Sequence, residues 1–518
     1  MIIEIKTAYM KRLIFLALIL LLIPKTAESQ DCSIIPAPRQ YQLMPGTFSF
    51  KSSSAIVAPE TLGEIAGLFA ESVSDILGSK LRVTTRGEKN GNILLSLDKS
   101  VMNTEGYELK IDPSHIEIKA STPAGIYYGL QTLHQLLISA GKGIVSSLSI
   151  NDSPRFAWRG IMLDVSRTFM PVNLVKRYID MFSWYKLNVV HLHLTDDQGW
   201  RIEIKRYPLL TEVGSKFDAK YNAMGGYYSQ DEIRELVKYA QLRNVTLVPE
   251  IELPGHACAA LAAYPWLSCA SLKPEIHTFF EGPNVHNEIF CAGKPEVYEF
   301  IFNVLDELIA LFPSEYIHIG GDEAPKEEWK KCSYCQKTIR DNNLANEEEL
   351  QSYFVKRIGE HLRNKNRILI GWDEIYDGGK LRGDEVLMFW RGWKAESVNK
   401  AASSGFKIVA SPTTHCYFDY DYEKINTRKV FDFEPVPSDA STQTAENYIG
   451  VQACFWSHID RSEYNIDKQL FPRIFGLAET AWATPENRNW EIFRSAANRN
   501  SEYLKSNHVN VYNDVSLK

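Results

Sequence analysis

Two adjacent acidic residues, Asp322 and Glu323, follow a pair of glycines at the end of a short apolar stretch. Residues 316–319 alternate large apolar and polar side chains, which is the pattern of a short strand, and glycines readily end a strand. Paired carboxylates at the end of a buried strand shift each other's proton affinity, as general acid–base chemistry requires. An acidic turn that opens a helix at Pro325 is the alternative, and the pair alone does not separate the two interpretations.

The elements that would position this pair form a regular alternation of short apolar strands and helical segments from Arg159 onward. Eight strands are predicted, at 160–166, 189–195, 246–251, 316–320, 368–372, 386–390, 407–411 and 450–456. Eight strands with intervening helices over this length are typical of a (β/α)8 barrel, an α/β fold. The active site of that fold lies at the C-terminal ends of the strands, so the residues after each strand are the candidates.

Nearly every predicted strand is followed by side chains suited to binding or catalysis. In chain order these are Asp164 and Arg167, Asp196 and Asp197, Glu252 and His256, Asp322 and Glu323, Trp372 to Glu374, Trp390 and Arg391, Tyr417 and Asp419, and Trp456 and His458. One polar strand end is usually a cap or a turn. Eight such ends on a scaffold that directs them to one place favour a shared site.

No spacing typical of a metal or nucleotide site accompanies these residues. His191 and His193 share one face of a predicted strand without an HExxH motif, so we interpret them as hydrogen-bonding residues of the barrel interior. Cys332 and Cys335 form a single CxxC without a second half, which is too little for a zinc site. No glycine-rich nucleotide loop follows a strand. Acids with several Trp, and no metal or cofactor, point to sugar chemistry.

Three longer motifs resemble those of glycoside hydrolase family 20, the β-N-acetylhexosaminidases. They are His318-Ile-Gly-Gly-Asp-Glu323, His193-Leu-Thr-Asp-Asp-Gln-Gly-Trp-Arg201 and Pro249-Glu-Ile-Glu-Leu-Pro-Gly-His256. The resemblance extends from about residue 30 to 505 and includes a smaller α+β domain before the barrel. It implies an exo-acting, retaining hydrolase whose substrate is a glycan with terminal β-linked GlcNAc or GalNAc.

The resemblance also implies that the substrate supplies its own nucleophile. The carbonyl oxygen of the 2-acetamido group attacks the anomeric carbon and forms an oxazolinium ion. Glu323 is expected to protonate the leaving oxygen and then to deprotonate water. Asp322 is expected to hold the acetamido group and to stabilise the positive charge on its nitrogen. A neighbouring anion would raise the proton affinity of Glu323 while Asp322 stays ionised.

Other residues match the family's substrate pocket. Arg167 resembles a clamp on the 3- and 4-hydroxyls, because its fork of donors suits paired oxygens. Tyr417 resembles a tyrosine that donates to the acetamido oxygen, and Asp419 a contact to outer hydroxyls. The pocket walls are matched by Trp372, Trp390 and Trp456.

A further set resembles residues that position the catalytic acids. It comprises Asp196 or Asp197, and the pair Glu252 with His256. For each of these residues taken alone, a structural ion pair stays the alternative, as a packed core aromatic does for each Trp.

One position departs from the family's pattern. Many members carry Trp-x-Glu on the last strand, whereas this sequence has Trp456-Ser457-His458. A side chain that can donate two hydrogen bonds and carry positive charge replaces an acceptor-only carboxylate. One hypothesis is a changed pocket that accepts 6-sulfated GlcNAc, which would make the protein a sulfoglycosidase. The other is that His458 still binds a hydroxyl.

The region before the barrel is predicted to be an α+β domain at 30–155, with the barrel at 156–518. Alternation at 106–112 and 115–120 predicts a hairpin, because Pro113 and Ser114 lie near its turn. Helical spacing of apolar residues predicts a helix from Ala124 to Ala140.

Residues 1–29 have the composition of a secretory signal peptide. Lys11 and Arg12 precede an apolar run that is too short for a membrane span, and Ala27 and Ser29 suit cleavage before Gln30. A lipid anchor at Cys32 is the weaker interpretation, because Asp31 precedes it. The protein is therefore expected to be exported, periplasmic or secreted, without a membrane span.

Composition limits the classes of partner. The 518 residues, 45% hydrophobic, allow two domains, and the net charge of −7 provides no basic surface for nucleic acid. Disulfides are permitted in an exported protein; Cys269 with Cys291 is the best pair, and Cys332 with Cys335 is either a local disulfide or two free thiols.

Two other functional classes remain open: a non-hydrolysing glycan-binding protein and a metal-dependent hydrolase on the same barrel. The natural glycan, its linkage and the oligomeric state are not indicated by any motif.

Overall fold

The computed structural model describes residues 34–141, 143–216, 225–269, 276, 286–457 and 462–518. The predicted signal peptide, Cys32 and His458 lie outside these residues. Within the described part of the chain, no helix combines the length and the apolarity that crossing a bilayer requires.

The N-terminal part is a seven-stranded mixed sheet with the strand order β1-β7-β5-β6-β4-β2-β3. Its strands are β1 (Gln40–Ser49), β2 (Ala55–Val57), β3 (Arg82–Thr84), β4 (Ile93–Leu97), β5 (Tyr107–Ile111), β6 (Ile116–Ala120) and β7 (Ile144–Asp152). The helices α2 (Gly63–Ser72), α3 (Ser74–Leu77) and α4 (Pro123–Ala140) accompany it. The predicted hairpin is confirmed as the antiparallel pair β5–β6, and the predicted helix as α4.

Helix α4 lies close against the sheet because it carries glycine where it meets the backbone. A Cβ at Gly125 would be 2.1 Å from the carbonyl oxygen of Gly106, so no larger residue fits there without a shift. Apolar side chains of α4, among them Ile126, Leu130 and Leu133, are fully buried in the core of this domain. Their burial provides the main stabilisation of the helix on the sheet.

The second part is a closed barrel of parallel strands in the order β12-β13-β14-β15-β16-β17-β8-β9. The strands are β8 (Trp158–Asp164), β9 (Val189–His193), β12 (Thr246–Glu250), β13 (Tyr316–His318), β14 (Ile368–Trp372), β15 (Val386–Phe389), β16 (Lys407–Ala410) and β17 (Tyr448–Phe455). All eight predicted strands are present, and their ends differ from the prediction by two residues or fewer. The predicted (β/α)8 fold class is confirmed.

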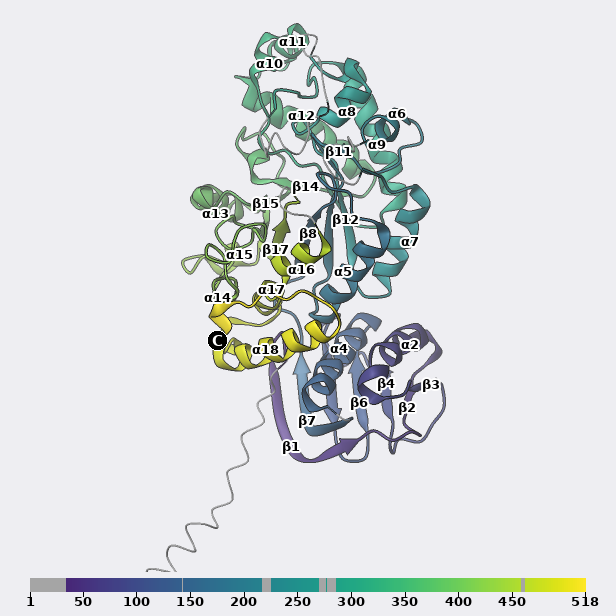
Figure 1. Cartoon of the computed structure of the whole chain (residues 1–518). Helices are drawn as coiled ribbons and strands as arrows, with labels where there is room; N and C mark the ends of the chain where they lie inside the picture. The colour runs from purple at the N-terminus through teal and green to yellow at the C-terminus, as the bar shows by residue number, and fades with distance from the viewer. Residues whose placement is uncertain (1–33, 142, 217–224, 270–275, 277–285, 458–461) are drawn as a thin grey trace, which may run out of the picture.

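Helices surround the barrel on its outside (Figure 1). The longer ones are α5 (Val172–Trp184), α7 (Gln230–Gln241), α9 (Pro295–Leu311), α12 (Glu347–Asn364), α13 (Ala395–Ser403), α16 (Glu463–Leu470), α17 (Arg473–Trp482) and α18 (Trp490–Ser506). Short elements in the connecting loops include β10 (Thr195–Asp196), β11 (Gly199–Trp200), α6 (Leu209–Glu212), α8 (Cys258–Ala263), α10 (Glu327–Lys331), α11 (Ser333–Asp341), α14 (Thr427–Phe431) and α15 (Thr442–Ala445). The strands are nearly continuous runs of buried residues, as expected when helices cover the sheet.

A buried ion pair joins the two domains. Lys186 Nζ lies 3.0 Å from Asp152 Oδ2, and both side chains are 0% exposed. Lys186 Nζ also donates to the hydroxyl of Tyr107, while the indole of Trp482 donates to Asp152. In Figure 1 the N-terminal sheet lies at the end of the barrel opposite the loops with α8, α10 and α11. The domain therefore packs against the part of the barrel domain that lies away from these loops.

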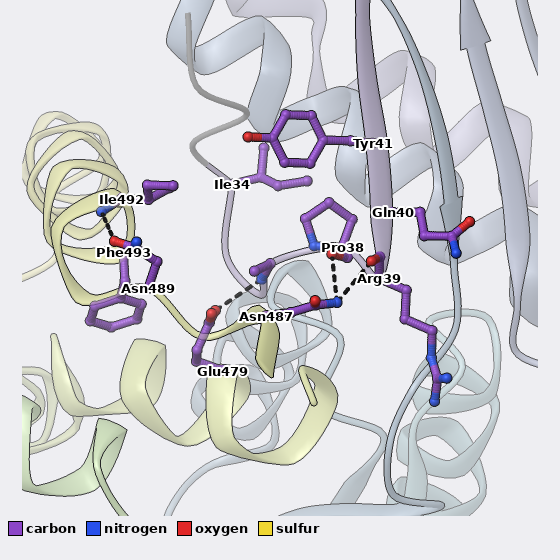
Figure 2. Close-up of a pocket in the computed structure, with 11 residues that line it drawn as sticks. Ile34, Pro38, Arg39, Gln40, Tyr41, Glu479, Asn487, Asn489, Ile492 and Phe493 are labelled. Atoms are coloured by element: carbon purple, nitrogen blue, oxygen red, sulfur yellow. Dashed lines mark hydrogen bonds between the residues drawn. The ribbon is translucent and has the colours of Figure 1, made fainter. Parts of the chain in front are cut away.

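A cavity of about 320 Å³ lies along this junction (Figure 2). Ala37 N donates to Glu479 Oε2 at 2.9 Å, and the Asn487 side chain donates to the Arg39 carbonyl. Burial raises the pKa of Glu479 to about 8. None of the residues predicted to act on a substrate lines this cavity.

The predicted disulfide between Cys269 and Cys291 is wrong in this structure, where both residues are unbonded thiols. The Cys269 sulfur approaches Cys335, whereas the Cys291 sulfur approaches both Cys332 and Cys335. Cys332 and Cys335, from a different loop, are thus further neighbours of these sulfurs, which the sequence spacing could not indicate.

Replacing Lys186 with Met should destabilise the protein, because Asp152 would keep a buried charge without its cation. Loss of one partner of a buried ion pair typically costs about 3–5 kcal/mol. The thermal unfolding temperature of Lys186→Met should therefore fall clearly below that of the wild type. Lys176→Met is the matched control, since Lys176 pairs with a Glu235 side chain that is 61% exposed and should matter little. Equal effects of the two substitutions would contradict the role given to the buried pair.

Candidate active site

The ends of β8 and β9 are joined by an arginine held between two aspartates. Arg167 Nη1 lies 3.2 Å from Asp164 Oδ2, and Nη2 lies 2.8 Å from Asp196 Oδ2. Burial opposes the charge of Arg167, but these carboxylates outweigh it and raise the pKa of the guanidinium. The Arg167 Nε is buried and has no hydrogen-bond partner among the described residues. The guanidinium of Arg167 is thus held in place by the two aspartates, and its Nε–H is left as a free hydrogen-bond donor.

Glu250, at the end of β12, is the centre of a buried network that sequence analysis did not single out. The indole of Trp372 donates to it at 3.0 Å, and ring nitrogens of three histidines approach its oxygens. The three are His191, His193 and His318. Burial would raise the pKa of Glu250, but His318 and His193 lower it well below its usual range. Glu250 is therefore a buried anion.

The predicted role of His191 and His193 as interior hydrogen-bonding residues agrees with these contacts. His193 contacts Glu250 with one ring nitrogen and Asp196 Oδ2, at 2.9 Å, with the other. Although burial opposes it, the charge of Glu250 raises the pKa of His193 to about 10. Burial lowers the pKa of His191 to about 4. One ring is thus a cation at neutral pH and the other is neutral.

His256 connects the aspartates after β9 to the acidic pair after β13. Its Nδ1 lies 3.1 Å from Asp197 Oδ2 and 3.4 Å from Asp196 Oδ1. Its Nε2 lies 3.5 Å from Glu323 Oε2 and 3.7 Å from Asp322 Oδ2. Asp196 raises the pKa of His256 well above its usual value although burial opposes this. A cation therefore bridges the two acidic groups.

The bend that exposes the acidic pair depends on Gly320. Its φ is +67°, and a Cβ there would be 1.7 Å from Glu252 Oε2. The Glu252 carboxyl thus occupies the space beside Gly320, where burial and the charge of Asp322 raise its pKa well above the usual value. Glu252 contacts His193 Nδ1 at 3.7 Å, so it supports the bend rather than forming a hydrogen-bonded pair with His256. Glu323 itself has a φ of +46°, a strained conformation for a non-glycine residue.

The two acids of the pair have different environments. The Asp322 side chain is 13% exposed and that of Glu323 is 39% exposed. Burial, with a smaller contribution from the charge of Glu323, raises the pKa of Asp322 to about 6. This shift is a consequence of burial in the folded chain, which the position of Asp322 in the sequence does not report.

Aromatic side chains from four strand ends line the region around the acids. Arg167 lies 4.8 Å from the ring of Trp456, which packs against Trp372 at 5.8 Å and Tyr417 at 6.3 Å. Trp390 stacks on Tyr417 with an interplanar angle of 25°. Trp372 is only 1% exposed, so it backs the wall that Trp456 and Tyr417 form. The predicted aromatic residues are therefore brought together.

Asp419 and Glu374 add two further acids to this region. Burial raises the pKa of Asp419 to about 7, although Arg473 and Arg167 counteract it. Burial and the charge of Asp322 raise the pKa of Glu374 to about 8, and its Oε2 accepts from the Trp390 indole at 2.7 Å. The sequence places Glu374 after the fifth strand, but it predicts no catalytic or binding role for this residue. Its proximity to Asp322 is a consequence of barrel closure, which no local pattern indicates.

Histidine and carboxylate groups here are close enough to hold a metal ion. Four overlapping groups of three such residues are found among the described residues of this region. They are formed by His191, His193, Asp196, Asp197, Glu250, Glu252, His256, His318, Asp322 and Glu323. A protonated imidazole is not a metal ligand, however, and the raised pKa values of His193 and His256 favour the protonated form. The groups that contain His193 or His256 therefore fit a hydrogen-bonded charge network better than a metal centre.

The arrangement offers a proton donor beside a buried anion. Glu323 is accessible, whereas Asp322 has an oxygen, Oδ1, that is buried without a partner among the described residues. Buried polar atoms are normally satisfied, so an orphaned carboxylate oxygen and the orphaned Arg167 Nε indicate groups kept for a ligand. Such a site can protonate a leaving group and stabilise a nearby positive charge.

Comparison with family models matches both domains. The model described as "Glycosyl hydrolase family 20, catalytic domain" matches residues 156–485, and "Glycosyl hydrolase family 20, domain 2" matches residues 31–153. A β-hexosaminidase of Porphyromonas gingivalis is 37% identical over 93% of this chain, which spans 66% of that protein. A β-hexosaminidase of Akkermansia muciniphila is 32% identical over 81% of this chain and 88% of its own length.

A solved structure has the same architecture. The family 20 exo β-N-acetylglucosaminidase of Vibrio harveyi, in complex with N-acetylglucosamine, superposes with a TM-score of 0.83 at 30% identity. The match covers 92% of this chain and 78% of that one.

Stability should depend on pH through Glu374, whose pKa is raised from 4.5 to about 8. Its stabilising contribution, as the neutral acid, is complete below pH 4.5 and is lost as pH rises through about 8. Glu374→Gln stays neutral, so its unfolding temperature relative to the wild type should increase from pH 5 to 8.5. The expected gain is on the order of a few kcal/mol in unfolding free energy. Glu235→Gln, at an exposed position, should give a difference that does not change with pH. A pH-independent difference for Glu374→Gln would overturn the assignment.

Proposed function

The chain belongs to glycosyl hydrolase family 20, and we propose that it is an exo-acting β-N-acetylhexosaminidase that removes terminal β-linked GlcNAc or GalNAc from glycans. The match of the catalytic-domain model over residues 156–485 supports the class of reaction. The names of the Porphyromonas gingivalis and Akkermansia muciniphila relatives support the sugar.

The observation that carries the proposal is the orphaned oxygen of Asp322 beside the accessible carboxyl of Glu323. Two acids that only bind a sugar could share one environment. Here one acid is buried and the other is exposed, which suits two different tasks in catalysis. The buried oxygen suits a contact to the acetamido nitrogen, whose charge grows as the reaction proceeds. The exposed carboxyl suits proton exchange with the leaving oxygen and then with water.

The proposed mechanism is retaining and substrate-assisted. The acetamido carbonyl oxygen attacks the anomeric carbon while Glu323 donates its proton to the departing oxygen, so the glycosidic bond breaks as the oxazolinium ring closes. Asp322 favours this step because the new positive charge lies beside its carboxylate. In the second step Glu323 removes a proton from water, and the water oxygen bonds to the anomeric carbon. The carbon–oxygen bond of the oxazolinium ring breaks at the same time, which regenerates the acetamido group and the protonated Glu323.

The raised pKa of Asp322 bears on how the site is used. A pKa of about 6 makes its ionised form costly in the free protein, because the charge is buried. A cationic intermediate beside it would remove that cost. The site therefore binds the cationic intermediate more tightly than the neutral substrate. Such preferential binding of the charged species increases the rate of the chemical step.

Other side chains are placed to hold the sugar. The unused Nε of Arg167 and the carboxyl of Asp419 supply groups for outer hydroxyls, and Trp456 and Tyr417 supply aromatic surface. Tyr417 is also a donor for the acetamido oxygen. We further propose that the protein is exported to the periplasm or secreted, on the leader-like composition of residues 1–29. The hypothesis of a 6-sulfated substrate depends on His458, which lies outside the described residues.

A chromogenic β-GlcNAc glycoside tests the proposal against a glycan-binding protein of the same fold. Release of the chromophore between pH 4 and 8 is expected. Binding of GlcNAc without any turnover would favour the binding protein instead. Loss of turnover on treatment with EDTA would favour a metal-dependent hydrolase only if Cys332→Ser combined with Cys335→Ser stays active and equally sensitive to EDTA, since a structural metal would otherwise give the same result.

Glu323→Gln should lose activity in proportion to how much the leaving group needs a proton. Loss of a general acid typically costs about 10²–10⁴-fold in rate. The loss in kcat should be near the upper end on an oligosaccharide and much smaller on an aryl glycoside with an acidic phenol. Steady-state kinetics on both substrates measure the difference. An equal loss on the two would contradict the role of Glu323 as the acid.

A thiazoline analogue of the cyclised acetamido group should inhibit strongly, because it resembles the bound intermediate. Such analogues bind at least about 10²-fold more tightly than ground-state ligands, so its inhibition constant should lie that far below that of GlcNAc. Asp322→Asn should weaken the inhibition, since the carboxylate no longer faces the ring nitrogen. Asp341→Asn, on the exposed side of α11, is the control and should leave the inhibition constant unchanged. An analogue that binds no better than GlcNAc would rule out the substrate-assisted mechanism.

A further inference from the structure

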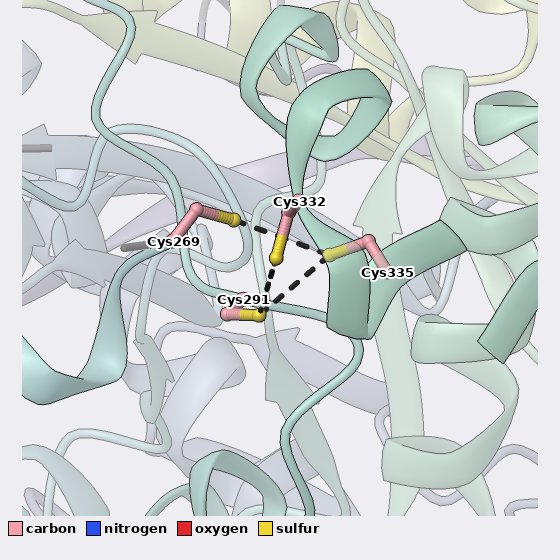
Figure 3. Close-up of side chains that lie close together, drawn as sticks. All are labelled: Cys269, Cys291, Cys332 and Cys335. Atoms are coloured by element: carbon pink, nitrogen blue, oxygen red, sulfur yellow. Dashed lines mark hydrogen bonds between the residues drawn. The ribbon is translucent and has the colours of Figure 1, made fainter. Parts of the chain in front are cut away.

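Four cysteines from two separate loops meet in the protein interior, and the proposed reaction uses none of them. Cys269 and Cys291 belong to the loop between β12 and α9, while Cys332 and Cys335 lie at the start of α11, in the loop after β13 (Figure 3). They are between 0% and 8% exposed. The motif Cys332-x-x-Cys335 is therefore joined in space by a second pair of cysteines, Cys269 and Cys291, from the other loop.

The separations of the sulfurs are those of a tetrahedral site. Cys291 Sγ lies 3.7 Å from Cys332 Sγ and 3.6 Å from Cys335 Sγ, and Cys269 Sγ lies 4.0 Å from Cys335 Sγ. All four sulfurs lie within 4.8 Å of one another. With Zn–S bonds of about 2.3 Å, the edge of a ZnS4 tetrahedron is about 3.8 Å. The measured distances bracket this value.

The same geometry does not suit disulfides. A disulfide brings two sulfurs to about 2.05 Å and leaves the other pair separate. Here Cys291 Sγ is almost equidistant from Cys332 Sγ and Cys335 Sγ, so no pairing is distinguished. A shared central ligand explains such an arrangement, because it needs each sulfur to be close to all the others.

The surrounding backbone supports a thiolate cluster. The thiols of Cys269 and Cys335 interact with the Cys291 sulfur, and the backbone N–H of Gly293 donates a hydrogen bond to it. A Cβ at Gly293 would be 2.2 Å from the Tyr334 carbonyl carbon, so the two loops pack backbone to backbone. Backbone hydrogen bonds to coordinating sulfurs are a common outer contact of metal sites.

We propose that Cys269, Cys291, Cys332 and Cys335 bind one Zn²⁺ as a closed, structural tetrathiolate site. Four sulfur ligands in tetrahedral arrangement select zinc over harder cations, and four protein ligands leave no open position for a substrate. The metal would join the loop that carries His256 to the loop that carries Asp322 and Glu323. The inference does not depend on the proposed glycosidase activity.

Metal content of the full-length wild-type protein tests the site directly. Elemental analysis after purification and dialysis against zinc-containing buffer should give one zinc per chain. Cys332→Ser combined with Cys335→Ser should reduce this to near zero. Cys416→Ser is the matched control, since Cys416 is equally buried but lies outside the cluster, and it should keep one zinc.

A second measurement on the unmodified protein applies even if the variants do not fold. After zinc is exchanged for Co²⁺, four thiolate ligands should produce intense sulfur-to-cobalt charge transfer and the visible bands of tetrahedral cobalt. A protein with no zinc, whose intact mass is lower by two hydrogens for each bond, would instead contain disulfides and overturn the proposal. Four titratable thiols that bind neither metal would overturn it as well.

Discussion

The site depends on compensation of negative charge buried at the carboxyl end of the barrel. Glu250 is completely buried, and it is an anion because histidines and an indole surround it. An uncompensated carboxylate there would cost several kcal/mol, so each acid must have a cation or donors within reach. The His193 and His256 cations lie between successive carboxylates, and Arg167 lies between two more. Positive and negative groups thus alternate from β8 to β13.

This alternation has a consequence for the acidic pair. The His256 cation that contacts the pair is shared with Asp196 and Asp197, so Asp322 is left only partly compensated. Its pKa is raised by burial, as are those of Glu374 and Asp419. A group of incompletely compensated carboxyls attracts a positively charged partner. In the proposed reaction that partner is formed from the substrate during catalysis.

The loops after β12 and β13 carry both the reacting pair and the cysteine cluster. Gly320 permits the bend at one end of the second loop, while Gly293 permits the two loops to touch at the other. The strained φ of Glu323 persists only where surrounding contacts hold the backbone. A link between these loops, from the cysteines, would supply part of that restraint. Glu252 fills the space beside Gly320, and the Gln351 side chain donates to the Gly321 carbonyl.

The chain sequence by itself determined the fold class, the eight strands and most of the residues at the strand ends. Alternating and apolar runs of residues indicate where strands lie. In a (β/α)8 barrel the residues that follow each strand lie at the same end, so their position in the sequence predicts that they belong to the site. Tertiary structure alone decided that burial raises the pKa of Asp322, that Glu250 and Glu374 belong to the network, and that Cys269 and Cys291 lie beside the CxxC cysteines. These properties depend on burial and on through-space contacts between distant loops. Neither leaves a periodic signal in the chain, because the partners are set by how the barrel closes.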